Sequence, residues 1–228
     1  MFFKKRLYCV FIDYEKAFDY IDRAFLWQKL MQTGVRGKIF TVIQNMYKKA
    51  KSCVKVHDKC SDYFQCCCGV RQGENLSPIL FAVFLNDLHS FISEKVNGLE
   101  GLAQEVRDAG WSHPDELIML KMFLLLYADD TVICAESADD LQKCLHAMSQ
   151  YCTKWSLKMN ANKTKVMVFS RGKVRKLPRI KYNNKDLEVV FGYQYLGLWF
   201  NYNNKFNVAQ KKNYSGEQNK WGEKQKIT

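Results

Sequence analysis

The sequence lacks the cysteine and histidine spacings that hold structural zinc. Its nine cysteines include no Cys-X-X-Cys pair, and none of its four histidines stands where it would complete a zinc site. Three cysteines are consecutive, Cys66 to Cys68, but adjacent strand residues point to opposite faces and do not chelate together. An odd number of cysteines in mostly apolar surroundings also disfavours a disulfide framework. We therefore expect reduced thiols in an intracellular, reducing compartment, either nuclear or cytoplasmic.

The hydrophobic pattern of the sequence also shows neither a secretory leader nor a membrane span. The first six residues, three of them basic, have no apolar core of the kind that signal peptides carry. The apolar run 117–128 contains Lys121 and ends at two aspartates, which disfavours a membrane span. We expect a soluble protein that has no membrane partner.

Acidic residues are scarce relative to basic ones. The 228 residues contain 23 Asp and Glu against 35 Lys and Arg, a formal net charge of +12. This balance favours a polyanionic partner such as nucleic acid. A hydrophobic content of 47% in a chain of this length predicts one globular unit with a sizeable core.

Hydrophobic periodicity predicts alternating strands and helices. Leu7 to Ile12 is an unbroken apolar run, typical of a buried central strand, and it ends at Asp13. Helical spacing predicts two helices between Asp22 and residue 48, and one long helix over 76–96. Two apolar runs, 118–127 and 131–135, predict a hairpin with aspartates at its tip. Ser137 and Asp140 form a capping box that begins another helix.

The remaining segments complete the expected order. A hairpin is expected from 53–56 and 63–68, a surface excursion over 97–114, and further strands over 166–169 and 189–200. These elements indicate an α+β fold, an antiparallel sheet with helices packed on one face, within a domain spanning residues 1–200. The polar residues 201–228 are expected to be a disordered tail.

Three carboxylates are predicted to meet at one edge of this sheet, namely those of Asp13, Asp129 and Asp130. Like charges that close repel one another unless a cation lies between them, and hard oxygen ligands favour Mg²⁺. Two such ions can clamp the attacking and leaving oxygens of a phosphoryl displacement. A lone pair of aspartates would more often mark a simple turn, so the wider pattern decides.

Five sequence blocks in one fixed order resemble the reverse transcriptases of LINE-type, non-LTR retrotransposons. Residues 11–19 (FIDYEKAFD) resemble motif A, 69–81 (GVRQGENLSPILF) motif B and 127–130 (YADD) motif C. Residues 160–165 (NANKTK) resemble motif D, and 195–197 (YLG) the motif E primer grip. The resemblance spans residues 4–208 and implies the palm of an RNA-directed DNA polymerase. Its partners would be an RNA template, a DNA primer and dNTPs.

The resemblance implies roles for individual residues. Asp13, Asp129 and Asp130 would bind two Mg²⁺ ions, for which Mn²⁺ could substitute, with the carbonyl of Tyr14 completing one shell. Phe18 would exclude a ribose 2′-hydroxyl and so select deoxynucleotides. The loop residues Arg71, Gln72 and Gly73 would contact the incoming nucleotide and template. Lys163, with Lys165 as the alternative, would protonate the pyrophosphate leaving group. Tyr195, Leu196 and Gly197 would hold the primer.

The sequence departs from the family by beginning almost at motif A and by losing the resemblance after motif E. The fingers motifs and the thumb are therefore expected to be largely absent, and the isolated chain to be inactive or barely active. Two alternatives stay open: a non-catalytic nucleic-acid-binding remnant of a mobile element, and an unrelated metal-dependent phosphotransferase.

Overall fold

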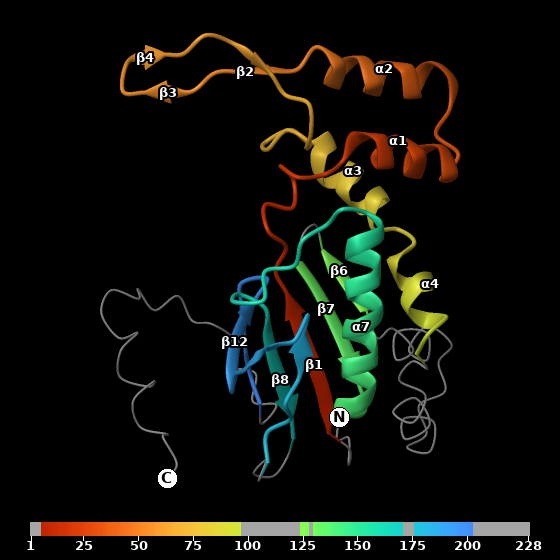
Figure 1. The fold of residues 1–228 in the computed structure, drawn as a ribbon, viewed down its shortest axis with the longest axis vertical. Helices are drawn as coiled ribbons and strands as arrows, with labels where there is room; N and C mark the ends of the chain where they lie inside the picture. The colour runs from red at the N-terminus through yellow and green to blue at the C-terminus, as the bar shows by residue number, and fades with distance from the viewer. Residues whose placement is uncertain (1–5, 97–123, 128–129, 171–175, 203–228) are drawn as a thin grey trace.

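The centre of the molecule is a five-stranded sheet in a computed structural model that describes residues 6–96, 124–127, 130–170 and 176–202 (Figure 1). The strand order is β11-β8-β1-β7-β6. Their bounds are β1 (Leu7–Ile12), β6 (Leu124–Tyr127), β7 (Asp130–Ala135), β8 (Lys165–Phe169) and β11 (Glu188–Val189). The predicted central strand is confirmed, because β1 pairs antiparallel with both β7 and β8.

The predicted α+β class is also confirmed, with one difference at the sheet edge. β11 runs parallel to β8, so the sheet is mixed rather than antiparallel throughout. Val190 continues this edge by donating its N–H to the Val166 carbonyl at 2.8 Å. The chain reaches this parallel register through a crossover that includes the small hairpin β9 (Lys181–Tyr182) and β10 (Lys185–Asp186).

Strand alternation divides the core between the two faces of the sheet. Val10 and Ile12 of β1 belong to the large cluster that packs against helices, whereas Cys9 and Phe11 belong to a smaller cluster on the opposite face. Helices α3 (Leu76–Phe84), α4 (Leu88–Ser93) and α7 (Ala138–Lys154) contribute to the first face. The hairpin of β12 (Gly192–Tyr195) and β13 (Leu198–Asn201) covers the second face.

Helix α7 begins where the capping box predicts. The Ser137 hydroxyl accepts the N–H of Asp140 at 3.0 Å, and it donates to the Asp140 carboxylate at 2.7 Å. The predicted apolar stripe is buried against the sheet; it comprises Leu141, Cys144, Leu145, Met148, Cys152 and Trp155. Burial of this stripe stabilises the helix-to-sheet contact.

The single long helix predicted over 76–96 is wrong, because the chain breaks it into α3 and α4 at residues 85–87. The Tyr151 hydroxyl donates to the Phe84 carbonyl at 3.1 Å, while the Leu88 N–H bonds Leu85 instead. Asp87, in the break, accepts from the Tyr151 hydroxyl and from the buried ammonium of Lys29. The break therefore places an acceptor beside a buried cation.

Lys29, from α1 (Arg23–Gln32), is buried in an aromatic cage between helices. Its ammonium lies 3.8 Å from the Trp155 ring centre and 3.1 Å from the Tyr151 hydroxyl, in addition to its ion pair with Asp87. These contacts join α1, the α3–α4 break and α7. We call Lys29, Asp87 and Tyr151 the buried polar network.

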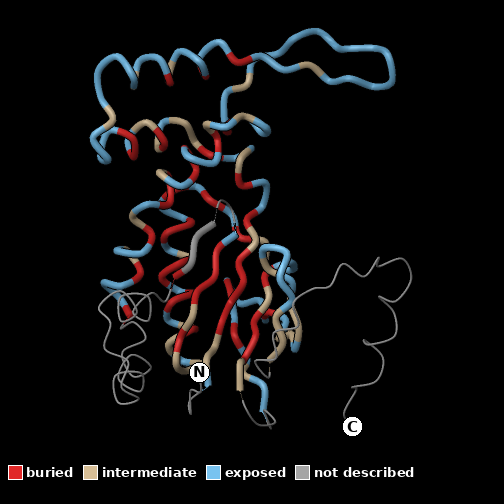
Figure 2. The backbone as a smooth tube through the Cα atoms, turned by 180° about the vertical axis from the view of Figure 1, so that it is seen from behind, coloured by how far each residue is buried: buried red, intermediate tan, exposed pale blue. Residues whose placement is uncertain are grey.

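A helix and a ribbon project beyond the sheet. α2 (Gly37–Lys48) confirms the second predicted helix, and after it come four short strands, β2 (Lys51–Ser52), β3 (Lys55–Val56), β4 (Lys59–Cys60) and β5 (Phe64–Gln65). Their pairing confirms that a hairpin forms, but the predicted strand bounds are wrong: β2 pairs with β5, and β3 pairs with β4, which lies between the two predicted strands. Figure 2 shows that this part of the chain is mostly exposed, in contrast to the buried sheet. We call residues 51–65 the arm.

The rest of the predicted elements fall partly outside the described residues. The excursion over 97–114, the tip residues 128–129 and the tail after residue 202 lie there. The strand segment 189–200 divides into β11, β12 and β13. By length and mean hydropathy, Leu76–Ser93 resembles a membrane span. Its residues Leu80, Phe84 and Leu88 are nevertheless buried in the core, as expected for core helices.

Candidate active site

Asp13 and Asp130 lie at neighbouring strand ends. Ile12 of β1 faces Thr131 of β7, so the next position along each strand brings Asp13 beside Asp130. Alternation places Cys9, Phe11 and Asp13 toward one face of β1, and Asp130, Val132 and Cys134 toward the same face of β7. Tyr127 of β6 pairs with Asp130 of β7, so only residues 128–129 separate the two strands in the sequence. Asp129 itself lies outside the described residues.

The electrostatics of two tyrosines agree with this placement. The pKa of Tyr193 is raised by burial first, then by the negative charge of Asp130 and then by that of Asp13. Burial and the charge of Asp130 raise the pKa of Tyr195 to about 12. Both carboxylates thus act on one phenol, on the face of the sheet that the helices leave open.

The segment resembling motif D is fastened to the Asp13 backbone. The Asn160 N–H donates to the Asp13 carbonyl at 2.7 Å, and the Asp13 N–H donates to the buried Thr164 hydroxyl at 3.2 Å. Lys163 projects from this turn with its side chain 71% exposed and its ammonium 4.0 Å from an Asp13 carboxylate oxygen. Lys165 is held by Glu188 at 2.6 Å and by the Asn162 carbonyl at 2.7 Å.

The segments resembling motifs A and B pack backbone against backbone. Gly69 donates its N–H to the Ile21 carbonyl at 2.8 Å, and Val70 donates to the Phe18 carbonyl at 2.7 Å. A side chain at Gly69 would collide with the motif A backbone, because its Cβ would lie 2.5 Å from the Asp19 carbonyl oxygen and 2.7 Å from that of Phe18. The Gln72 amide donates to the Asp19 carboxylate at 3.0 Å. The two loops therefore form one unit beside Asp13.

The residues predicted to contact the nucleotide differ in whether other groups of the protein already engage them. The ring of Phe18 is half-buried, 5.2 Å from the ring of Phe81. Arg71 pairs with Glu74 at 2.6 Å and donates to the Met46 carbonyl at 3.3 Å. Gly73 has a φ of +85° and open space around it. The side chain of Tyr14 is buried on the helix face, where its hydroxyl accepts from Thr131 at 3.3 Å.

The segment resembling the primer grip forms the turn of the β12–β13 hairpin. Leu196 and Gly197 both have positive φ, 49° and 78°, as the turn of a two-residue hairpin requires. The Tyr195 hydroxyl donates to the Asp130 carbonyl at 3.5 Å, and the rings of Tyr193 and Phe11 lie 4.4 Å apart. The hairpin is thereby packed beside the carboxylates.

The sequence did not predict the structural role of Arg23, which anchors several loops beside the site. Its guanidinium donates to four backbone carbonyls, those of Tyr47, Cys66, Cys68 and Gly69, at 2.5–3.1 Å. It also lies over the Tyr47 ring, 5.1 Å from its centre. Arg23 therefore fixes the base of the arm and the start of the motif B loop to α1.

The donor set at the strand ends suits a hard divalent cation. Asp13 and Asp130 offer carboxylate oxygens on one face, and after burial their two charges are the further causes of the raised pKa of Tyr193. Within the described residues, which omit Asp129, no group of three or more acidic, histidine or cysteine side chains could hold a metal ion. The third carboxylate of the predicted set is that of Asp129.

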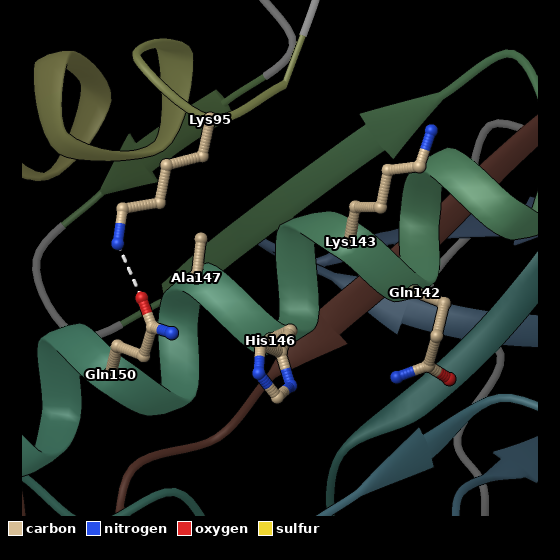
Figure 3. A pocket seen from close by; sticks show the side chains of 6 residues that line it. All are labelled: Lys95, Gln142, Lys143, His146, Ala147 and Gln150. Atoms are coloured by element: carbon tan, nitrogen blue, oxygen red, sulfur yellow. Dashed lines mark hydrogen bonds between the residues drawn. The ribbon is translucent and has the colours of Figure 1, made fainter.

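A pocket of about 410 Å³ lies elsewhere, on the outer side of α7 (Figure 3). Its lining consists of Lys95, Gln142, Lys143, His146, Ala147 and Gln150. Lys95 donates to the Gln150 amide across one end of it, and Lys143 pairs with Asp140 at 3.0 Å. None of the predicted site residues contributes to this pocket.

A mixed sheet with helices on one face, and acidic residues at adjoining strand ends on the other, is consistent with the palm of a polymerase. The family model for reverse transcriptase (RNA-dependent DNA polymerase) matches residues 3–200. The chain therefore belongs to the reverse transcriptase family. Proteins of this family generally use divalent metal ions and bind a nucleic acid template.

Curated relatives come from non-LTR retrotransposons. The chain is 25% identical over 194 residues to the RNA-directed DNA polymerase from mobile element jockey of Drosophila funebris, covering 82% of this chain and 19% of that protein. It is 27% identical over 156 residues to the Pol polyprotein of retrotransposable element R2DM of Drosophila melanogaster, covering 68% and 13%. The chain thus spans about a fifth or less of the length of these relatives.

Solved telomerase structures share the fold. Telomerase from Candida tropicalis in complex with the TWJ fragment of telomeric RNA aligns with a TM-score of 0.58 at 16% identity, covering 92% of this chain and 30% of that one. Apo telomerase from the same organism, truncated from its C-terminal domain, aligns with a TM-score of 0.57. At such identity the likeness concerns the fold alone.

Proposed function

We propose that this chain is the catalytic palm segment of an RNA-directed DNA polymerase, which adds dNTPs to a primer 3′-hydroxyl on an RNA template. The observation that carries the proposal is the meeting of Asp13 and Asp130 on the face of the sheet opposite the helices, at neighbouring ends of β1 and β7. Family membership supports the reaction class. The fixed turns around Asp13 support a preorganised site.

Asp13, Asp129 and Asp130 would hold two Mg²⁺ ions, with Mn²⁺ as a substitute and the Tyr14 carbonyl as a further oxygen ligand. When bound, two such ions activate the attacking hydroxyl and neutralise charge on the leaving pyrophosphate. The Thr164 hydroxyl and the Asn160 N–H fix the backbone of Asp13 on both sides. These two hydrogen bonds hold the Asp13 backbone at the end of β1 in a fixed position.

Phe18, Gln72 and Gly73 would form the nucleotide-binding surface. The Phe18 ring packs against the buried Phe81 ring, which suits a rigid barrier against a ribose 2′-hydroxyl. Gln72 is oriented by Asp19, and Gly73 leaves space for close approach of a ligand. Arg71 would contact substrate only after release from Glu74.

Lys163 is the candidate general acid, and the structure offers a reason to prefer it to Lys165. Lys163 is exposed and reaches toward Asp13, whereas the ammonium of Lys165 is engaged by Glu188 and the Asn162 carbonyl. An exposed cation beside the reacting phosphates can deliver a proton to the leaving pyrophosphate. Tyr195, Leu196 and Gly197, at the turn of the β12–β13 hairpin, would hold the primer end beside the carboxylates.

Counting bound Mn²⁺ by electron paramagnetic resonance tests the proposal without requiring turnover. The chain should bind two Mn²⁺ ions in the presence of a dNTP, and Asp13→Asn or Asp130→Asn should each lower the count or weaken binding at least tenfold. Asp139→Asn is the matched control, because Asp139 is an exposed carboxylate at the start of α7, beyond the opposite end of β7. An Mn²⁺ count unchanged by Asp13→Asn would overturn the proposal.

Primer extension by the isolated chain measures the second part of the proposal. With protein in excess over a labelled primer on RNA, Mg²⁺ and dNTPs should give only a trace of extended product, which Asp129→Ala abolishes. Robust cDNA from the wild-type chain would contradict the expectation of weak activity. Extension that survives Asp129→Ala would contradict the assignment of the carboxylates.

A further inference from the structure

The arm is an exposed ribbon without a core of its own. Every residue from Lys51 to Gln65 is exposed except the half-buried Cys53. Its apolar side chains include Val54 at 55%, Val56 at 60%, Phe64 at 50% and Tyr63 at 72% exposure. An isolated two-stranded ribbon is marginally stable in water, and a ligand bound to the ordered ribbon would stabilise it.

A β-bulge turns the strand that carries Tyr63. At the base of the arm Ser52 faces Phe64, and at its end Lys55 faces Cys60. Two residues link β2 to β3, but three residues, 61–63, link β4 to β5. Val54 and Ser61 are paired by two hydrogen bonds of 2.9 Å, so the extra residue falls at Asp62 or Tyr63. A bulge of this kind re-aims the neighbouring side chain.

The arm, the end of α2 and the residues between them are basic. They carry five exposed lysines, at positions 48, 49, 51, 55 and 59, against two aspartates, Asp58 and Asp62. Within the part of the chain that the structure describes, none of these lysines takes part in an ion pair. Exposed cations can contact the phosphates of a polyanion, and exposed aromatic rings beside them can stack on its flat apolar groups.

The base of the arm is fixed, and its direction is defined. Arg23 binds the carbonyls of Cys66 and Cys68, and the Gln65 amide donates to the Lys48 carbonyl at 3.0 Å. The arm leads directly into the motif B loop, which packs on the turn after Asp13. In Figures 1 and 2 the arm projects toward the same side of the molecule as the β12–β13 hairpin.

We propose that the arm binds single-stranded nucleic acid, with Tyr63 stacking on an unpaired base and Lys51, Lys55 and Lys59 contacting phosphates. The inference rests on the proposed function to the extent that this strand would be the template approaching the carboxylates. A single strand is favoured over a duplex, because only unstacked bases offer their faces to an exposed aromatic ring.

Fluorescence anisotropy with a labelled 20-nucleotide unstructured RNA, in EDTA and at several salt concentrations, tests the lysines. The triple variant Lys51→Ala, Lys55→Ala, Lys59→Ala should reduce the slope of log affinity against log salt by about 2, since each phosphate contact on a single strand contributes about 0.7. The control triple variant Lys176→Ala, Arg179→Ala, Lys181→Ala removes the same charge from exposed positions beside α7. That control should leave the slope unchanged.

Tyr63 variants test the stacking. Tyr63→Ala should weaken binding of the single strand about 5- to 150-fold, the effect of losing one stacked base, whereas Tyr63→Phe should retain it. Tyr63→Leu keeps an apolar side chain without a π face and should behave like Tyr63→Ala. A blunt RNA duplex of equal length should show little effect of any of these changes.

Equal loss of slope in both triple variants would mean that only bulk charge binds RNA, and would overturn the proposal. A Tyr63→Ala effect of the same size on the duplex would overturn the assignment to a single strand. The assay contains neither free divalent metal ions nor dNTPs, so its result is independent of the carboxylates. Conversely, the Mn²⁺ count does not involve the arm, so either proposal can fail while the other stands.

Discussion

Replacing Asp87 with alanine should destabilise this protein more than replacing Lys29 with methionine, although the two residues form one ion pair. The side chain of Lys29 is 3% exposed and that of Asp87 is 43% exposed. Removing Asp87 leaves a buried ammonium without its counter-charge, whereas removing the ammonium leaves a carboxylate that water can reach. The cost depends on which charge is left behind.

The magnitudes follow from the contacts of the buried polar network. Loss of one partner from a buried pair costs about 3–5 kcal/mol. The Trp155 ring and the Tyr151 hydroxyl still face the Lys29 ammonium, at 3.8 and 3.1 Å, so we expect the lower end, about 3 kcal/mol, for Asp87→Ala. Lys29→Met keeps the apolar stem and should cost less than about 1 kcal/mol.

Urea unfolding followed by circular dichroism measures both free energies. Asp186→Ala, at an exposed position on β10, is the control and should stay within about 0.5 kcal/mol of wild type. Equal destabilisation by Lys29→Met and Asp87→Ala would refute the reasoning, because it would mean that the pair itself, rather than the uncompensated ammonium, determines stability.

The pH dependence gives the same reasoning a second readout. Burial lowers the pKa of Lys29, and Asp87 opposes this shift. Between that lowered pKa and the ordinary value of about 10.5, the unfolded chain binds more protons, so stability rises with pH. Without Asp87 the pKa falls further. The deficit of Asp87→Ala relative to wild type should therefore shrink as the pH rises from 7 to 10.

Three other changes have defined outcomes. Gly69→Ala should cost more in urea unfolding than Gly34→Ala, by about 1–2 kcal/mol, because both have positive φ but only at Gly69 would a Cβ meet a backbone carbonyl, at 2.5 Å; equal costs would contradict this. Arg23→Lys should speed amide hydrogen exchange across residues 66–70, since one ammonium cannot bind four carbonyls; unchanged exchange would remove Arg23 as the anchor of the arm. Asp130→Asn should lower the pKa of Tyr195 from about 12 toward its ordinary value, because the Asp130 charge is second only to burial among the causes of the raised pKa. Titration followed by ¹³C NMR of labelled tyrosine measures this pKa, and an unchanged pKa would contradict the prediction.

Elements with a strong local signal were predictable from the sequence. β1 follows from an unbroken apolar run, and α7 follows from a capping box with an apolar stripe behind it. The register between β1 and β7 then follows from burying both runs, which is why Asp13 and Asp130 could be expected together. Local pattern and tertiary packing agree at these positions.

Contacts that depend on tertiary packing were not predictable in the same way. The break at residues 85–87 arises because Asp87 meets a lysine and a tyrosine that are distant in sequence. Lys29 has a signal in retrospect, since it shares the stripe of Leu26 and Leu30 and so faces the core. Arg23 shows its role only when the carbonyls around it are known. Periodicity predicts which face is buried, but it does not predict the partner of a buried charge.

The most direct test of the central claim is anomalous diffraction from crystals of the chain soaked with Mn²⁺ and a nonhydrolysable dNTP analogue. We predict two anomalous peaks between the end of β1 and the turn that joins β6 to β7, within bonding distance of the Asp13 carboxylate and of at least one of Asp129 and Asp130. Peaks elsewhere on the molecule, with none at Asp13, would contradict the claim that these aspartates share divalent ions.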